Sequence, residues 1–216
     1  MTDPWTSRLA ALPVSVVSDG LDAIGLREQV MAPHVRPLAD TDAMVGRAHT
    51  MEVVEVDGPP ASTDLYYASE IAAVDSVQPG HVLVGSTCRG SLWGELLSTA
   101  AQFKGAAGIV ADTFTRDVAG IRELGFPAFF AGIHAADSLG RIDVREIGGE
   151  ITCAGVSVRE GDYVLADLDG VVVIPAERIE EAITAAEEKA RREGDVRALL
   201  EEGRTVREVF NSFGIL

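Results

Sequence analysis

The sequence has few cysteines, no long apolar run and no leader-like start, and each shortage excludes a class of protein. Its two cysteines, Cys88 and Cys153, form no CxxC or Cys/His spacing, which argues against a zinc site. We expect both to be packed small residues. No apolar stretch approaches the roughly 20 residues that a membrane helix needs, and the first residues lack the basic and apolar segments of a signal peptide. We therefore expect a cytoplasmic protein with reduced thiols.

Positive charge is also scarce, because 34 acidic residues against 18 lysines and arginines give a formal net charge of −16. Such a surface repels phosphate backbones and anionic lipids, so neither nucleic acid nor membrane is an expected partner. An anionic substrate would need a local positive centre, either an arginine or a metal ion. The chain also lacks a GxxxxGK[ST] phosphate loop, a GxGxxG loop after a strand and a GxSxG nucleophile motif.

The pattern that is present is that of an α/β protein. With 47% hydrophobic and 24% charged residues, the 216-residue chain fits one domain over residues 1–216. Apolar runs predict strands at 49–56, 81–85, 108–112, 127–131, 144–147, 151–158, 163–166 and 171–174. Helical spacing predicts helices within 1–30 and at 65–77, 94–104, 118–124 and 176–202. We expect Ser18-Asp19-Gly20 to cap a second helix, and Ile71 and Val74 to point inward.

The centre of this pattern is a strand–helix–strand unit through residues 81–112. Its two strands should be parallel with a right-handed crossover, whereas the glycine turns after residue 140 predict antiparallel or mixed pairing. The final helix, about 176–202, has a narrow apolar stripe and is otherwise charged. We expect it to pack on a neighbouring subunit as well as on its own core.

Two loops of the central unit carry the residues that point to chemistry. Because the carboxyl ends of parallel strands meet at one edge, the helix start at Gly94 should lie beside Arg116-Asp117. First-turn backbone N–H groups suit a carboxylate, and Arg116 offers a charged fork to a carboxylate or an enolate oxygen. Asp117 is a hard oxygen ligand, and Mg²⁺ is typically held by about one or two carboxylates. Glu95 and Asp112 are candidates to hold metal-bound waters.

A structural reading of the same residues stays open. Arg-Asp pairs are common at surfaces, and an acid such as Glu95 in a first turn suits the helix dipole by itself. The scattered histidines are expected to be structural or surface residues: His34, His49, His81 and His134.

A spaced set of residues gives the sequence a family likeness. Glu95 is followed by twenty residues, then Arg116-Asp117, then Gly120 and Glu123. Further matching stretches are Ser18 to Asp22, Trp93 to Leu97, Gly105 to Val110, Gly125 to Phe129 and Gly161 to Pro175. Over roughly residues 13 to 205 the chain resembles the RraA-like family (regulator of ribonuclease activity A), which includes the class II 4-hydroxy-4-methyl-2-oxoglutarate/4-carboxy-4-hydroxy-2-oxoadipate aldolases.

The resemblance implies a compact single-domain β/β/α sandwich that assembles as a homotrimer or hexamer. It also implies roles: backbone amides of Gly94, Glu95, Leu96 and Leu97 hold pyruvyl oxygens, Arg116 binds the 2-oxo oxygen, and Asp117 binds Mg²⁺ or Mn²⁺. Family members bring an acid from a neighbour's C-terminal helix toward the metal waters, and Glu193 is the best match here.

Two functions follow as hypotheses. The first is a metal-dependent lyase that cleaves a 4-hydroxy-2-oxo diacid to pyruvate by retro-aldol chemistry, with Glu95 or Glu193 polarising a metal-bound water as base. Oxaloacetate decarboxylation, which yields the same enolate, is its expected second activity. The second hypothesis is a regulator that binds and inhibits ribonuclease E, for which an acidic surface is suited. The sequence leaves the substrate's tail open.

Overall fold

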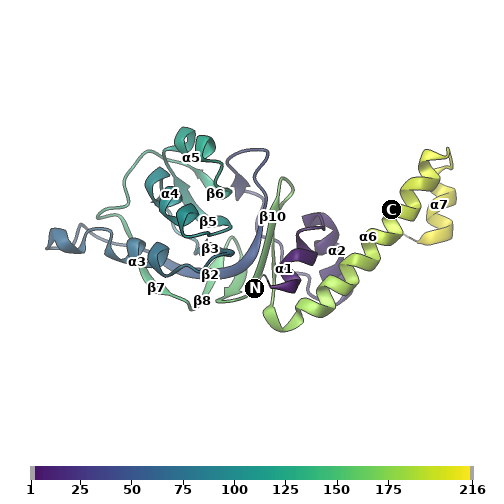
Figure 1. Ribbon diagram of the computed structural model, residues 1–216, viewed down its shortest axis with the longest axis horizontal. Helices are drawn as coiled ribbons and strands as arrows, with labels where there is room; N and C mark the ends of the chain where they lie inside the picture. The colour runs from purple at the N-terminus through teal and green to yellow at the C-terminus, as the bar shows by residue number, and fades with distance from the viewer. Residues whose placement is uncertain (1–2, 215–216) are drawn as a thin grey trace.

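A mixed nine-stranded sheet forms the body of the protein. The computed structural model describes residues 3–214, so the outermost residues of the predicted 1–216 domain lie outside it (Figure 1). The main path of the sheet runs β1-β6-β5-β3-β2-β10-β11, with β4 paired to β5 and β7 to β2. The strands are β1 (Arg36–Pro37), β2 (Met44–Glu55), β3 (His81–Gly85), β4 (Ser91–Trp93), β5 (Gly108–Thr115), β6 (Ala128–Ile133), β7 (Ile142–Ile147), β10 (Tyr163–Asp167) and β11 (Gly170–Ile174).

Helices cover this sheet in two groups. One group lies over β3, β5 and β6, and the other lies at the β10–β11 end (Figure 1). The first comprises α3 (Ala68–Ser76), α4 (Glu95–Phe103) and α5 (Val118–Leu124), with the 3-10 turn η1 (Thr63–Leu65) before it. The second comprises α1 (Pro4–Leu9), α2 (Val14–Ala23) and α6 (Ile179–Glu201), with η2 (Ala176–Arg178) before α6 and α7 (Val206–Phe213) after it. Within residues 3–214, no helix has the length and apolar character to cross a membrane.

The predicted strand–helix–strand unit is confirmed as β3–α4–β5. The two strands pair in parallel, with Val84 opposite Val110, and α4 crosses between them from Gly94 to Lys104. The loop expected between residues 86 and 93 contains a further short strand, β4, whose Trp93 pairs with Thr115. The α/β class with mixed strand pairing is therefore correct, and the extra strand joins the two predicted loops directly.

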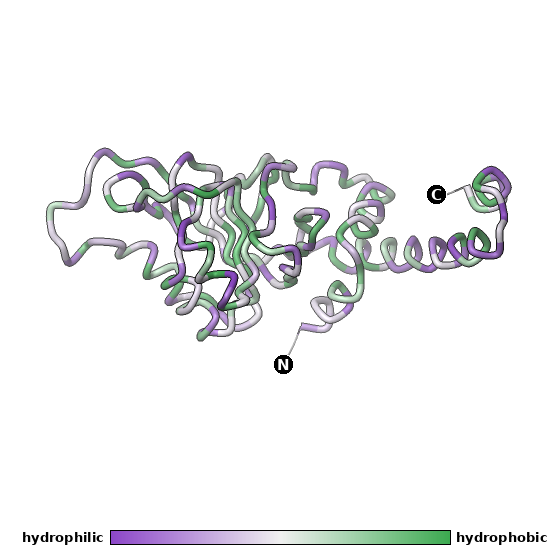
Figure 2. The backbone as a smooth tube through the Cα atoms, turned by 90° about the horizontal axis from the view of Figure 1, so that it is seen from above, coloured by the Kyte–Doolittle hydropathy of each residue, from purple (hydrophilic) through white to green (hydrophobic). Residues whose placement is uncertain are grey.

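Alternation along the strands divides the core between the two sheet faces. Leu83 and Ile109 face α3, α4 and α5, whereas Val82 and Val110 face the opposite side. There a separate hairpin packs on the sheet, formed by β8 (Glu150–Cys153) and β9 (Val156–Arg159). Figure 2 shows the strands as the most hydrophobic part of the chain. A sheet buried on both faces explains why its strands are nearly continuous apolar runs.

Helix α6 packs on α2 at its start and then extends away from the sheet, with α7 folded back at its far end (Figure 1). Its predicted stripe is confirmed, since Ile179, Ile183 and Ala186 are buried. At Gly20 an added Cβ would lie 2.8 Å from the Ala186 backbone nitrogen, so the two helices approach too closely for a side chain there. Packing of α6 on a neighbouring subunit stays a prediction.

Two local predictions were wrong. The single strand expected at 151–158 is a hairpin that turns at Ala154 and Gly155, both with positive φ, as a tight two-residue hairpin turn requires. The expected cap at Ser18-Asp19-Gly20 lies inside α2, because the helix already begins after Pro13. Pro13 is the residue before the first helical turn, so the helix begins at Val14, four residues before Ser18.

Candidate active site

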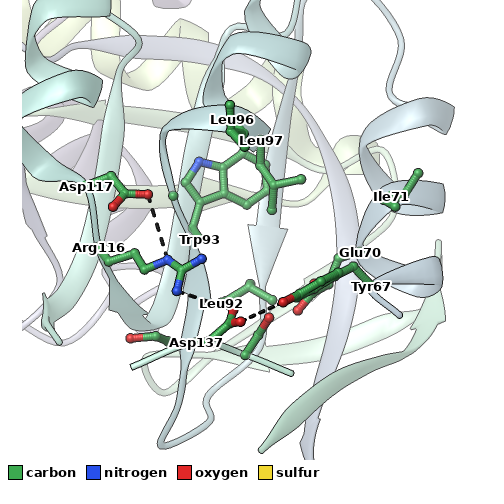
Figure 3. A pocket seen from close by; sticks show the side chains of 13 residues that line it. Tyr67, Glu70, Ile71, Leu92, Trp93, Leu96, Leu97, Arg116, Asp117 and Asp137 are labelled. Atoms are coloured by element: carbon green, nitrogen blue, oxygen red, sulfur yellow. Dashed lines mark hydrogen bonds and ion pairs between the residues drawn. The ribbon is translucent and has the colours of Figure 1, made fainter. Parts of the chain in front are cut away.

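A cavity of about 380 Å³ opens where the parallel strands end (Figure 3). Four separate segments line it: the start of α3, the β4–α4 junction, the β5–α5 junction and the loop after β6. The lining includes the side chains of Tyr67, Glu70, Ile71, Arg116, Asp117 and Asp137. The cavity lies at the carboxyl edge of the parallel strands, where such sheets bind their ligands.

Arg116 is held against the helix start by backbone pairing. Its amide donates to the Trp93 carbonyl at 3.0 Å, and the Thr115 hydroxyl donates to the same carbonyl at 3.0 Å. The guanidinium then crosses the cavity, with Nη1 3.3 Å from Oδ1 of Asp137 and Nε 3.8 Å from Oδ2 of Asp117 (Figure 3). The predicted meeting of Gly94 with Arg116-Asp117 is thus present in the fold.

Asp117 has a backbone conformation that frees its carboxylate. It lies in the left-handed region, with φ 58°, and its side chain does not cap α5, which begins directly after it. Instead, Oδ2 accepts a long hydrogen bond of 3.4 Å from the Glu95 amide. A Cβ on Gly94 would fall 2.6 Å from this oxygen, so the absence of a side chain keeps the space beside Oδ2 open.

This donor set fits a hard divalent cation that takes few protein ligands. Asp117 brings one carboxylate to the cavity, held only by two long contacts, from Arg116 Nε at 3.8 Å and from the backbone amide of Glu95 at 3.4 Å. Among the described residues, no group of three or more His, Cys, Asp or Glu side chains is placed to enclose a metal. Mg²⁺ keeps several waters and needs only about one or two carboxylates, so the Asp117 carboxylate fits such an ion.

Glu95 packs against α5. An added Cβ at Gly120 would lie 2.8 Å from the Glu95 carboxyl carbon, so glycine at this position makes room for the acid. Glu95 itself is exposed, as is Leu96, whereas Leu97 is partly buried against the core. The spacing between Glu95 and Gly120 thus reflects a direct contact between two helices. Glu123 is also exposed, on the same short helix.

Three polar residues of the cavity were not predicted from the sequence. The Tyr67 hydroxyl donates to Asp137 at 2.6 Å, and this bond raises the pKa of the tyrosine. Burial alone would raise the pKa of Asp137, but the bond from Tyr67 and the charge of Arg116 hold it below its usual range. Tyr67 itself has φ 57°, so it and Asp117 are two of three non-glycine residues with positive φ in the described chain.

Glu70 is the third polar cavity residue that was not predicted from the sequence. It is 5% exposed, and its Oε1 is among the buried side-chain atoms that have no hydrogen-bond partner within residues 3–214. Burial raises the pKa of Glu70 to about 7, against the lowering effect of the Ser138 hydroxyl. Ile71, expected to point into the core, is instead 48% exposed and lines the cavity, because Glu70 takes the inward position on α3.

Two predicted residues lie elsewhere. Asp112 is wrong as a cavity residue: strand alternation puts it on the sheet face opposite to Ala111, where its carboxylate binds His34 at 2.7 Å and Thr87 at 2.6 Å. Glu193 lies on α6, which extends toward the end of the molecule opposite to α4 and α5 (Figure 1). It pairs with Lys189 at 3.4 Å, and its predicted role in a neighbour's site is unchanged by this placement.

Comparison with known proteins decides the family. The family model described as RraA-like, Aldolase/RraA, matches residues 14–173. The chain belongs to the RraA-like family. A Halalkalibacterium halodurans protein named "Putative 4-hydroxy-4-methyl-2-oxoglutarate aldolase" is 31% identical, over 86% of this chain and 83% of its own length. A Pseudomonas paraeruginosa protein of the same name is 32% identical, over 74% of this chain and 94% of its own.

A solved RraA-like structure shares the fold. RraAS2 of Streptomyces coelicolor, described as an unusual member of the RNase ES inhibitor RraA protein family, is 26% identical with a TM-score of 0.80. The match covers 92% of this chain and 99% of that one. The fold expected from the family likeness is thereby confirmed.

Proposed function

We propose that this RraA-like chain is a divalent-metal-dependent pyruvate lyase that cleaves a 4-hydroxy-2-oxo acid by a retro-aldol reaction. The names of its relatives offer 4-hydroxy-4-methyl-2-oxoglutarate as the first substrate to test. The observation that carries the proposal is the convergence of Arg116 and Asp117 on one cavity, beside the first turn of α4. A positive fork and the amides of a helix start suit the carboxylate and 2-oxo group of such an acid, and the Asp117 carboxylate suits the metal ion.

The reaction breaks the C3–C4 bond of the substrate. The C4 hydroxyl loses its proton and C4 becomes a carbonyl, while the electron pair passes to the pyruvyl half as an enolate, which is then protonated at C3. Arg116 is positioned to neutralise the oxygen on which this charge develops, and a preorganised cation of this kind lowers the barrier most where water is excluded. Glu95, acting through a bridging water, is the acceptor that we assign to the hydroxyl proton.

Mg²⁺ or Mn²⁺, when bound, supplies a Lewis acid at the 2-oxo group. Asp117 would hold the ion, with Glu95 supporting its waters. We propose further that the protein is a homotrimer or hexamer in which Glu193 of α6 reaches the site of a neighbour. The supporting observation is that α6 extends away from its own sheet (Figure 1).

Oxaloacetate gives the most direct test, because losing CO₂ from it yields the same enolate without a base. We expect pyruvate release with Mg²⁺, little with EDTA, and a loss on the order of 100-fold in Arg116→Ala. Arg27→Ala is a matched control, since Arg27 is exposed and does not line the cavity. Equal rates with Mg²⁺, with EDTA and in Arg116→Ala would reject the lyase.

Regulation of a ribonuclease is the second candidate. It is favoured by the similarity to the RNase ES inhibitor family member and by the net charge of −16, which suits a basic partner. Purified ribonuclease E should then be captured at low salt and released at high salt. Absence of capture at low salt would reject this function and leave the lyase untouched.

A further inference from the structure

The cavity is short of positive charge. Arg116 is the only cation among its described lining residues, and both Asp117 and Asp137 already lie within 4 Å of the guanidinium. Glu70 adds a third acid on the α3 side, opposite Asp117 in Figure 3. A 2-oxo acid brings one carboxylate of its own, which Arg116 and the α4 amides can hold. Beyond Arg116 and the proposed metal ion, which both serve the 2-oxo acid end, the described lining residues offer a second substrate carboxylate no further cation.

The rest of the lining is apolar. Trp93 and Leu97 form the wall above Arg116, and Ile71 and Leu96 lie at the rim, 48% and 81% exposed (Figure 3). Such surface gains free energy by covering alkyl groups and gains nothing from a hydrated carboxylate. The Tyr67 hydroxyl already donates to Asp137, which leaves it little to offer an additional anion.

We propose that this cavity selects 4-hydroxy-2-oxo acids whose C4 substituents are uncharged, and that Glu70 and Asp137 disfavour substrates with a second carboxylate on C4. The proposal rests on the lyase function above and names the substrate class of that site. The chemistry of the step is unchanged: the bond between C3 and C4 breaks, the hydroxyl proton leaves, and the neutral C4 fragment departs as a ketone or an aldehyde.

Glu70 has the more direct part in this preference. Because its Oε1 is buried without a partner, its carboxyl group has an unmet hydrogen-bonding demand at the cavity wall. This oxygen is itself buried, so a ligand in the cavity does not bond it, and the charge of the Glu70 carboxylate stays uncompensated toward a carboxylate on C4. Asp143, behind Glu70, adds further negative charge to this side.

A matched substrate pair tests the proposal. 4-Hydroxy-4-methyl-2-oxopentanoate and 4-hydroxy-4-methyl-2-oxoglutarate differ only in a methyl group against a carboxylate on C4. With Mg²⁺, we expect kcat/KM for the methyl compound to exceed that for the diacid by about tenfold or more. Substrate loss is the readout, because the diacid releases two pyruvates. Oxaloacetate serves as the reference for basal lyase activity, since its departing carboxylate takes the place of C4 itself.

Glu70→Gln separates a charge effect from the intrinsic reactivity of the two substrates. The variant should lower KM for the diacid about fivefold relative to KM for the methyl compound, because it removes a repulsion that only the second carboxylate experiences. Asp75→Asn is the matched control: it removes a carboxylate from the same helix, outside the cavity. Its substrate ratio should stay at the wild-type value.

The outcomes separate the two proposals. Turnover of oxaloacetate together with equal or faster cleavage of the diacid would overturn the substrate class and leave the lyase standing. An unchanged substrate ratio in Glu70→Gln would remove the role of Glu70. No pyruvate from any of the three compounds with Mg²⁺ would reject the lyase, and the substrate class with it.

Discussion

Two clusters of charged side chains lie on this sheet, and they differ in how completely they are paired. On β2, His49 binds Glu160 at 3.1 Å and Ser76 at 3.0 Å, and Glu160 also accepts from the Thr50 amide at 2.7 Å. In the cavity, by contrast, the buried oxygen Oε1 of Glu70 has no partner in the described chain, and Asp117 has only two long contacts, with the Glu95 amide at 3.4 Å and with Arg116 at 3.8 Å. The His49–Glu160 cluster links β2 to α3 and to the turn after β9, whereas the incompletely paired side chains of the cavity are available to a ligand.

The pKa values of one glutamate from each cluster, Glu160 and Glu70, move in opposite directions. Burial would raise the pKa of Glu160, but the hydrogen bonds from His49 and Thr50 outweigh burial and hold it below its ordinary value. Burial raises the pKa of Glu70 to about 7, because too little opposes it. Opposite pKa shifts predict that the two groups change the free energy of unfolding with pH in opposite directions. Substitutions in the cavity should mainly change activity, whereas substitutions in the His49–Glu160 cluster should mainly change stability.

The largest effect is expected at Asp117. Asn tolerates the left-handed backbone as Asp does, so Asp117→Asn should fold normally while losing the charge that would hold the metal. We expect metal-dependent pyruvate release to fall by about 100-fold or more, with an unchanged denaturant midpoint. Activity that survives in Asp117→Asn and still requires Mg²⁺ would place the metal elsewhere.

Glu70→Gln should change stability in a pH-dependent way. Between pH 4.5 and about 7 the folded protein binds more protons than the unfolded chain, so the raised pKa lowers stability as pH rises through this window. The variant removes this cost, which is on the order of 3 kcal/mol and is complete above about pH 7. Urea unfolding should therefore show the variant more stable than wild type at about pH 8, with the gain gone at about pH 4. A gain of equal size at both pH values would contradict the buried-charge explanation.

Glu160→Gln should show the reverse. Its lowered folded pKa contributes stability that is present above the unfolded value and is lost as pH falls through the folded value. We expect a loss of about 2 kcal/mol near neutral pH, as for a partly buried group that loses charged hydrogen bonds, and a smaller loss in acid. Turnover per folded molecule should stay at the wild-type level, measured after correction for the folded fraction by circular dichroism.

Gly120→Ala gives the smallest effect and the sharpest contrast between stability and activity. Alanine favours a helix over glycine by about 1 kcal/mol, but its Cβ would push on the Glu95 carboxylate. We expect kcat to fall about tenfold with no comparable loss of stability. Thr184→Ala on α6 is the control, since Thr184 is exposed and its hydroxyl bonds only the Glu180 carbonyl of the same helix. Equal kcat in both variants would show that the placement of Glu95 is unimportant.

The sequence was sufficient for the part of the site that depends on local order. Parallel strands joined by a helix bring their carboxyl ends together, so the meeting of Gly94, Arg116 and Asp117 followed from chain order alone. Asp112 was misplaced because its face depends on strand alternation, which the structure continues from Ala111. Alternation along residues 108–112 of the sequence carries that signal.

The remainder of the site required tertiary contacts. Tyr67, Glu70 and Asp137 come from two loops and a helix whose meeting depends on α3 packing against β7 and on the path after β6. Neither the packing of α3 on β7 nor the path of the chain after β6 has a signature in the local sequence. Glu70 could not be recognised from the sequence, because acidic residues are rarely buried. The apolar neighbour Ile71 was therefore predicted to point inward, where the structure has Glu70.

The left-handed backbone conformations of Tyr67 and Asp117 make selection for stability oppose selection for activity. Glycine at either position would relieve about 1 kcal/mol or more of steric strain, more at tyrosine than at aspartate. A library of variants sorted only by heat tolerance should therefore enrich glycine at residues 67 and 117, and in doing so remove the hydroxyl and the carboxylate from the cavity. Variants that survive such a screen would be more stable but would lack the two polar groups of the cavity. The residue types at these two positions in natural relatives would therefore distinguish chains selected for catalysis from chains selected for stability alone.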